Sequence, residues 1–248
     1  MKTAPYYAKA RVRAILNALE KYHQFQETDS LHRLRVEIKK FKSVIMVLGH
    51  SDKKFDAHEH YLSLRNVFRK AGQIRQPAVL IELMLMYGVS GLPVERLGDP
   101  KKAADKFRSD TPFFMTQVKK LGRKLRPRIK KIRKKDINGY IKELEKYIRE
   151  TLVPRLNASQ LHSARKRMKQ IVYLTGLTDR VSKEDRKFYS RMEKDVGVLH
   201  DKETLLELLT GLPRKQDVTA AKMLLKKQVA AERKEIAAKA KAFYQKED

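Results

Sequence analysis

Apolar residues recur along this chain at steps of three and four, the spacing that places side chains on one face of an α-helix. One run has steps of 3, 4, 3, 4 and 3 and consists of Leu31, Leu34, Ile38, Phe41, Ile45 and Leu48. A second run, between about residues 158 and 175, places Leu161, Ala164, Met168 and Ile171 on one face. No convincing period-two alternation marks a half-buried strand, so the pattern predicts an all-α protein.

The rest of the chain shows the same periodicity. Further helices are expected at about 4–27, 53–72, 77–88, 101–134, 138–152, 182–197, 200–210 and 216–245. Pro112 and Pro127 are expected to interrupt the helix at 101–134, and residues 88–100 give the clearest loop. Helices this long favour bundles, and the last of them predicts a long C-terminal helix.

The charge of the chain makes this helical protein a candidate polyanion binder. The 248 residues include 57 Lys and Arg against 29 Asp and Glu, a formal charge of +28. Such a charge attracts nucleic acid, an acidic membrane surface or a phosphate polymer. With 42% hydrophobic residues, the chain is too apolar for charge-driven disorder. The absence of cysteine excludes disulfides, Cys-ligated zinc, iron–sulfur clusters and a Cys nucleophile.

No membrane or export signal stands out in the sequence. Residues 1–13 lack the apolar core of a secretory signal. The most apolar stretch, residues 78–89, is too short to span a bilayer and carries Glu82. We therefore expect a soluble, cytoplasmic protein that does not insert into membranes.

Two sequence elements occur twice in the same order. Residues 31–39 and 161–169 both read L-H-x-x-R-x-x-x-K, at an offset of 130. Residues 72–76 align with residues 197–201 at an offset of 125, and each copy leads into an apolar helical segment. The repeat predicts two helical halves, at about 4–135 and 136–246.

A second stripe of side chains runs beside the apolar one. His32, Arg35, Lys39 and Lys42 each follow a core position by one residue, about 100° around the helix. His162, Arg165 and Lys169 repeat this geometry. The helices that follow add cations at helical spacing: Arg65 and Arg69 in the first half, and Lys187, Arg191 and Lys194 in the second.

The simplest interpretation of such a stripe is a solvated helix face. Like charges at i, i+4 repel by roughly 0.2–0.5 kcal/mol per pair. The stripes lack interleaved carboxylates that would relieve this repulsion, although Glu37 lies on the first helix. A bound anion would offset the cost in both halves. Arg supplies planar forked donors and Lys a mobile charge, which suits a phosphate chain, and a polyanion would favour protonated histidine.

Other charged and polar features carry weaker signals. The run from Lys119 to Lys135 contains eleven cations and no acid, and fits a solvated face, an electrostatic funnel or a further wall of the anion site. The spacing of His58 and His60 does not suit a metal site, and His23, His50 and His200 are expected at the surface or in caps. Asp201 and Glu203 are expected to cap a helix.

The two H-x-x-R-x-x-x-K helices, together with Gly197-Val198-Leu199-His200-Asp201, resemble the CHAD family, the conserved histidine α-helical domain. The resemblance covers about residues 4–246. It implies one domain of two four-helix bundles related by a pseudo-twofold axis, with a basic site for inorganic polyphosphate. The residues that would line this site by the resemblance are His32, Arg35, Lys39, Lys42, His162, Arg165 and Lys169. We expect the site to include, in addition, Arg65, Arg69, Arg75, Arg191 and Lys194.

The chain departs from the family pattern at two places. Arg75-Gln76-Pro77 stands where the family usually reads Arg-Asp, and Val172-Tyr173 stands where it reads Arg-Tyr. Lys42 therefore has no basic counterpart at Val172. The departures predict a lopsided site with more charge from the first half.

Three classes of function remain open from the sequence. The first is a non-catalytic module for inorganic polyphosphate, without cofactor or metal, in the cytoplasm or at polyphosphate granules. The alternative is a nucleic-acid-binding basic domain, although the stripes lack base-stacking aromatics and base-reading amides. An enzyme ranks third, because phosphoryl transfer normally requires carboxylates for Mg²⁺ and no acidic cluster lies on the stripes.

Overall fold

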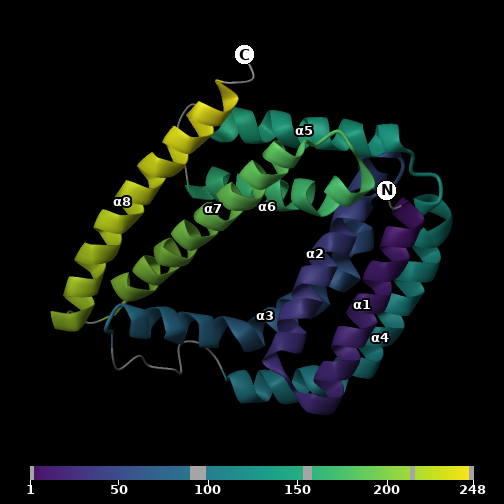
Figure 1. Ribbon diagram of the computed structural model, residues 1–248. Coiled ribbons are helices and arrows are strands. Elements are labelled where there is room, and N and C mark those ends of the chain that lie inside the picture. The colour runs from purple at the N-terminus through teal and green to yellow at the C-terminus, as the bar shows by residue number, and fades with distance from the viewer. Residues whose placement is uncertain (1–2, 90–98, 153–157, 213–215, 246–248) are drawn as a thin grey trace. The chain divides into compact units, whose positions relative to one another are not determined.

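The prediction of an all-α protein is confirmed. The structure, a computed structural model, describes residues 3–89, 99–152, 158–212 and 216–245, and in these ranges it contains eight α-helices, one 3₁₀ turn and no strand (Figure 1). The helices are α1 (Ala4–Phe25), α2 (Thr28–Ser51), α3 (Ala57–Met86), α4 (Pro100–Ile129), α5 (Lys134–Leu152), α6 (Ala158–Leu174), α7 (Lys183–Thr210) and α8 (Gln216–Tyr244).

The chain divides into two compact units. The first consists of residues 1–79, 93–140 and 176–179, and the second of residues 80–92, 141–175 and 180–248. The first unit therefore holds α1, α2, α4 and most of α3, while the second holds α6, α7, α8 and most of α5. The duplicated halves at 4–135 and 136–246 stay a prediction.

In the first unit, α1 packs against both α2 and α4 (Figure 1). The apolar stripe predicted from Leu31 to Leu48 lies on α2, and each of its six members is buried. Residues of α1 such as Ile15 and Leu19 are also fully buried. Close approach of α1 and α4 is possible because Gly122 presents no side chain to Val12, whose Cγ1 lies 3.2 Å from the ideal Cβ position.

Helix α4 runs through Pro112 and Pro127, so the predicted interruptions are wrong. Proline removes the donor that would bond to the carbonyl four residues earlier. For Pro112 that carbonyl belongs to Arg108, and the Nδ1–H of His23 on α1 donates to it at 3.2 Å. The Nε–H of Arg108 in turn donates to the His23 carbonyl at 3.2 Å. A neighbouring helix thus supplies the hydrogen bond that the proline cannot make.

Helix α3 is likewise continuous through Pro77, where two shorter helices were expected. The apolar residues Ile74 and Leu80 on either side of the proline are both buried. Burial of an apolar face stabilises a helix by more than the roughly 3 kcal/mol that an internal proline costs. Burial around Pro77 therefore outweighs the local break signal.

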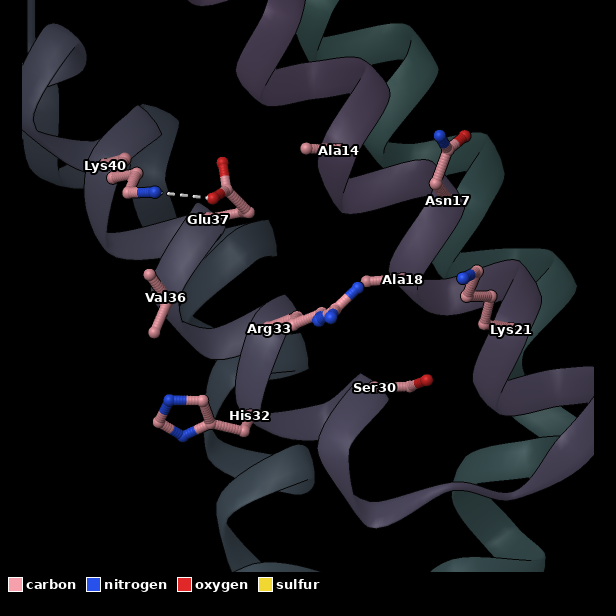
Figure 2. Close-up of a pocket in the computed structure, with 10 residues that line it drawn as sticks. All are labelled: Ala14, Asn17, Ala18, Lys21, Ser30, His32, Arg33, Val36, Glu37 and Lys40. Carbon is pink, nitrogen blue, oxygen red and sulfur yellow. Dashed lines mark hydrogen bonds and ion pairs between the residues drawn. The ribbon is translucent and has the colours of Figure 1, made fainter.

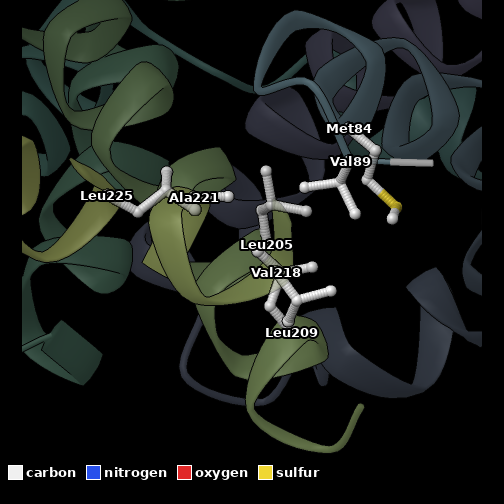
Figure 3. Close-up of a cluster of buried hydrophobic side chains, with 7 residues drawn as sticks. All are labelled: Met84, Val89, Leu205, Leu209, Val218, Ala221 and Leu225. Atoms are coloured by element: carbon white, nitrogen blue, oxygen red, sulfur yellow. The ribbon is translucent and has the colours of Figure 1, made fainter. Parts of the chain in front are cut away.

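In the second unit, α7 packs against both α6 and α8. Its apolar contacts with the end of α3 and with α8 include a cluster of buried side chains (Figure 3): Met84, Val89, Leu205, Leu209, Val218, Ala221 and Leu225. Helix α7 begins with a capping box, in which the Ser182 hydroxyl accepts from the Asp185 amide and the Asp185 carboxylate accepts from the Ser182 amide. It continues to Thr210, so the predicted division near residue 198 is wrong.

Among the described helices, none combines the length and the apolar character that a membrane-spanning helix needs.

Candidate anion-binding site

In the first unit, Arg35 joins α2 to α3. Its Nη1 donates a hydrogen bond of 2.8 Å to the backbone carbonyl of Phe68. Its Cζ lies 4.0 Å from the centroid of the Phe68 ring, so the guanidinium also makes a cation–π contact. The Phe68 carbonyl engages one of the five N–H donors of the guanidinium, which leaves donors for an anion.

A glycine makes this position of Arg35 possible. Side chains of a helix tilt toward its N-terminus, so the side chain at position 72 would cover the turn that contains Phe68. Gly72 leaves that turn open, and a Cβ there would lie 2.1 Å from Nη1 of Arg35. The guanidinium of Arg35 therefore occupies the space that a side chain at position 72 would fill, and we call this space the seat of Arg35.

Cations crowd around Arg35. Burial, followed by the charge of Arg75, lowers the pKa of Arg35. Partial burial lowers the pKa of His32, and the charges of Arg75, Lys39 and Arg35 lower it further, against the opposing charge of Asp29. Among the described residues, neither Arg35 nor Arg75 has a carboxylate within ion-pair distance. The local potential is therefore strongly positive.

Two lysines of the stripe lie over aromatic rings of α3. The Nζ of Lys39 is 5.5 Å from the Phe68 ring centroid, and the Nζ of Lys42 is 4.6 Å from that of Tyr61. Burial raises the pKa of Tyr61 to about 12, although the charges of Arg65 and Arg35 oppose this shift. We define the α2–α3 cluster as His32, Arg35, Lys39, Lys42, Tyr61, Arg65, Phe68, Gly72 and Arg75.

The second unit has a different arrangement on α6 and α7. The Oε1 atom of Glu193 accepts from Nε of Arg165 at 3.2 Å and pairs with Nζ of Lys169 at 2.7 Å. All three side chains are largely buried, with Glu193 16% exposed. The second stripe carries no interleaved carboxylate of its own, but Glu193 of the next helix pairs with Arg165 and Lys169 and relieves their repulsion without a bound anion.

A glycine also leaves space for the guanidinium of Arg165. A Cβ at Gly197 would lie 2.5 Å from Nη2 of Arg165. Glu193 precedes Gly197 by four residues, as Phe68 precedes Gly72. We define the α6–α7 cluster as His162, Arg165, Lys169, Glu193, Gly197 and His200.

His162 packs against another histidine instead of facing solvent alone. Its ring centroid lies 4.5 Å from that of His200, and its buried Nδ1 has no hydrogen-bond partner among the residues that the structure describes. Burial is the main cause that lowers the pKa of His162 to about 4, and the charges of Lys166, His200, Arg165 and Lys169 lower it further. His162 is therefore neutral at neutral pH. His200, expected at the surface or in a cap, lies inside α7.

The neutral state of His162 predicts acid sensitivity. Because its folded pKa of about 4 lies below the ordinary 6.5, the unfolded chain takes up a proton first as pH falls. The contribution of His162 to stability is fully present above about pH 6.5 and is lost toward pH 4. Between about pH 7 and about pH 5 we expect a loss on the order of 1 to 2 kcal/mol from this residue.

Chemical denaturation of the wild type and of His162→Gln at the two pH values measures this loss. We expect a smaller pH-dependent change in the free energy of unfolding for the variant, because glutamine does not titrate. Equal changes in the two proteins would contradict the assignment of a buried neutral histidine.

Three of the residues expected in the site lie outside these contacts. Arg69, Arg191 and Lys194 are exposed, and no described contact brings them into the α2–α3 or α6–α7 cluster. Conversely, Phe68, Tyr61 and Glu193 belong to the clusters although the sequence did not single them out. Asp201 and Glu203, expected in a cap, lie within α7, and Glu203 pairs with Arg233 of α8.

A groove of about 490 Å³ lies between α1 and α2 (Figure 2). Its apolar part includes Ala14, Ala18 and Val36, and Arg33 extends from α2 toward α1. Its lining shares only His32 with the α2–α3 cluster. The groove is thus not where the arginine and lysine stripe converges.

The cationic run from Lys119 to Lys135 forms the exposed face at the end of α4 and the start of α5. Each of its eleven cations is exposed, and three of them pair with carboxylates: Arg128 with Asp52, Arg133 with Asp136 and Lys134 with Asp179. A cationic face of this kind attracts polyanions over long range. Among the described residues, no contact connects it to the α2–α3 cluster.

Within the described ranges, no three His, Asp or Glu side chains are grouped so that they could hold a metal ion. The α2–α3 cluster presents N–H donors that aromatic rings and a backbone carbonyl hold in place, and donors of this kind can bind an anion. No protein-family model matches the chain, and neither the curated proteins nor the solved structures yield a match.

Proposed function

We propose that this protein binds inorganic polyphosphate without catalysis, through the α2–α3 cluster. The observation that carries the proposal is the seat of Arg35, which holds a half-buried guanidinium beside Lys39 and Arg75 with no carboxylate paired to either arginine among the described residues. The cations repel one another because they lie close together. A bound phosphate chain would offset this repulsion through its attraction to each cation.

Membership of the CHAD family remains part of this proposal. Supporting it are the repeated H-x-x-R-x-x-x-K helices and the parallel contacts of Arg35 with Gly72 and of Arg165 with Gly197. The same features support a duplicated architecture of two helical bundles. A cytoplasmic location, with association to polyphosphate granules, completes the proposal.

Nucleic acid is the second candidate ligand, and the exposed Lys119–Lys135 face favours it. The α2–α3 cluster favours polyphosphate instead. Phe68 and Tyr61, its two aromatic residues, already lie beneath the cations Arg35 and Lys42. A base could stack on such a ring only after displacing the cation, whereas a phosphate chain needs only the N–H donors.

Comparison of ligands at one salt concentration tests the proposal. The protein is titrated with long-chain polyphosphate, pyrophosphate, duplex DNA and single-stranded RNA. We expect polyphosphate to bind most tightly, because its phosphates can contact the clustered cations without bases to accommodate. Tight binding of DNA or RNA without binding of polyphosphate would overturn the proposal.

The affinity for polyphosphate should fall steeply with salt. If Arg35, Lys39, Lys42 and Arg75 each contact one phosphate, with the slope of about 0.7 per contact known for single-stranded nucleic acid, the association constant drops roughly 50-fold between about 50 mM and about 200 mM salt. Titrations over this range measure the drop. An affinity that does not change with salt would exclude the cationic cluster as the site.

A further inference from the structure

We infer that Glu193 acts as a built-in anion that closes a second phosphate-binding site in the α6–α7 cluster. This inference rests on the proposed function, because it assumes that the α2–α3 cluster shows what the open form of such a site looks like. It predicts that the protein binds phosphate chains at the α2–α3 cluster and not at the similarly built α6–α7 cluster, because the carboxylate of Glu193 occupies the latter.

The two clusters share the same frame of residues. Arg35 and Lys39 have their counterparts in Arg165 and Lys169 at the offset of 130. In each cluster the arginine lies against a glycine of another helix. A Cβ added at Gly72 would lie 2.1 Å from Nη1 of Arg35, and one added at Gly197 would lie 2.5 Å from Nη2 of Arg165. Each frame therefore presents an arginine and a lysine, one turn apart, to the same side of a glycine-bearing helix.

The frames differ at the position one turn before the glycine. In the α2–α3 cluster this position is Phe68, an uncharged residue whose ring lies against Arg35 and Lys39. In the α6–α7 cluster it is Glu193. Both Phe68 and Glu193 align at the offset of 125 that relates the two glycines.

Glu193 makes the contacts that a phosphate oxygen would make. A single carboxylate oxygen, Oε1, accepts from Arg165 and pairs with Lys169, at 3.2 and 2.7 Å. Charge-assisted contacts of this kind are the ones that bind phosphate. Because Glu193 is part of the chain and largely buried, a phosphate in solution must displace a carboxylate of high effective concentration and is also repelled by its charge.

Glu193→Gln in a background without the first site tests the inference. The background is Arg35→Gln/Lys39→Gln, and the probe is inorganic tripolyphosphate, which is too short to coat the whole surface. We expect Glu193→Gln to raise the affinity of this background by at least about tenfold, and addition of Arg165→Gln to remove the gain.

Glu37→Gln is the matched control. Glu37 also bridges two cations, Arg11 at 2.6 Å and Lys40 at 2.7 Å, and is 13% exposed, so its substitution changes the net charge and frees two cations in the same way. Its cations do not belong to either glycine-bearing frame. We expect less than about a twofold gain from Glu37→Gln. Equal gains from both substitutions, or no gain from Glu193→Gln, would overturn the inference.

The reciprocal substitution covers the case in which Glu193→Gln does not fold. Phe68→Glu in the otherwise unchanged protein places a carboxylate beside Arg35 and Lys39, and should weaken tripolyphosphate binding by at least about tenfold. Phe68→Gln, which adds no charge, should weaken it much less. Equal effects of the two substitutions in folded proteins would contradict closure by a carboxylate.

The outcomes separate this inference from the proposed function. If the unchanged protein binds neither tripolyphosphate nor long-chain polyphosphate but the Glu193→Gln variant binds tripolyphosphate, the proposed function fails and the closed site stands. If the unchanged protein binds through Arg35 and Lys39 but neither Glu193→Gln nor Phe68→Glu has its expected effect, the proposed function stands and the inference fails.

Discussion

Replacing Arg35 and Lys39 with glutamine should weaken polyphosphate binding by at least about tenfold more than replacing Lys131 and Lys135 with glutamine. Both double variants lower the net charge from +28 by two, so the long-range attraction falls equally. Arg35 is half-buried and held by Phe68, whereas Lys131 and Lys135 are exposed. Loss of a positioned, partly desolvated contact raises the dissociation rate, while loss of a rim charge mainly slows association.

Equilibrium titration with polyphosphate at one salt concentration measures the difference, after circular dichroism has shown that both variants are helical. Equal losses would mean diffuse electrostatic binding without a defined site. A larger loss from Lys131 and Lys135 would move the site to the exposed face of α4 and α5.

Gly72→Ala should reduce polyphosphate affinity by about tenfold while it leaves the fold intact. The new Cβ would stand 2.1 Å from Nη1 and 3.1 Å from Cζ of Arg35, so the guanidinium must leave its seat and lose its bond to the Phe68 carbonyl. Alanine gains about 1 kcal/mol of helix propensity over glycine, which offsets a lost hydrogen bond of about 1 kcal/mol. The free energy of unfolding should therefore change by less than about 1 kcal/mol.

Gly176→Ala provides the control, because an added Cβ at that position meets no atom within 4 Å. We expect this variant to bind polyphosphate as tightly as the wild type. Unchanged binding by Gly72→Ala would show that the position of Arg35 does not matter for the ligand.

The helices that carry the site could be predicted from sequence because their signals are local. The stripes of His32, Arg35 and Lys39 and of His162, Arg165 and Lys169 follow from helical spacing alone, and the structure places them on α2 and α6. The prediction of lopsided charge rests on Lys42, which has no basic counterpart at Val172, and it stays a prediction. The structure adds a second difference between the clusters, which is Phe68 in one and Glu193 in the other.

The partners of those stripes could not be predicted, because they come from other helices. The spacing of Arg165 and Lys169 gives no information about Glu193, which lies 28 residues beyond Arg165 and meets it only through the packing of α6 against α7. The sequence nevertheless contained a clue. Gly72 and Gly197 lie within helices, where glycine is unfavourable, and this marks places where another group approaches the backbone.

The predictions that helices end at prolines were wrong for a similar reason. Pro112 is a local break signal, but the carbonyl of Arg108 that it leaves unbonded accepts from His23 of another helix. A tertiary contact of this kind overrides a local preference.

Footprinting of lysines by acetylation, read by mass spectrometry with and without bound polyphosphate, tests the location of the site most directly. If polyphosphate binds in the α2–α3 cluster, the acetylation rates of Lys39 and Lys42 fall at least about tenfold at saturation, and Lys131 and Lys135 react nearly as before. Protection confined to Lys119–Lys135, with Lys39 and Lys42 reacting at their original rates, would contradict the central claim.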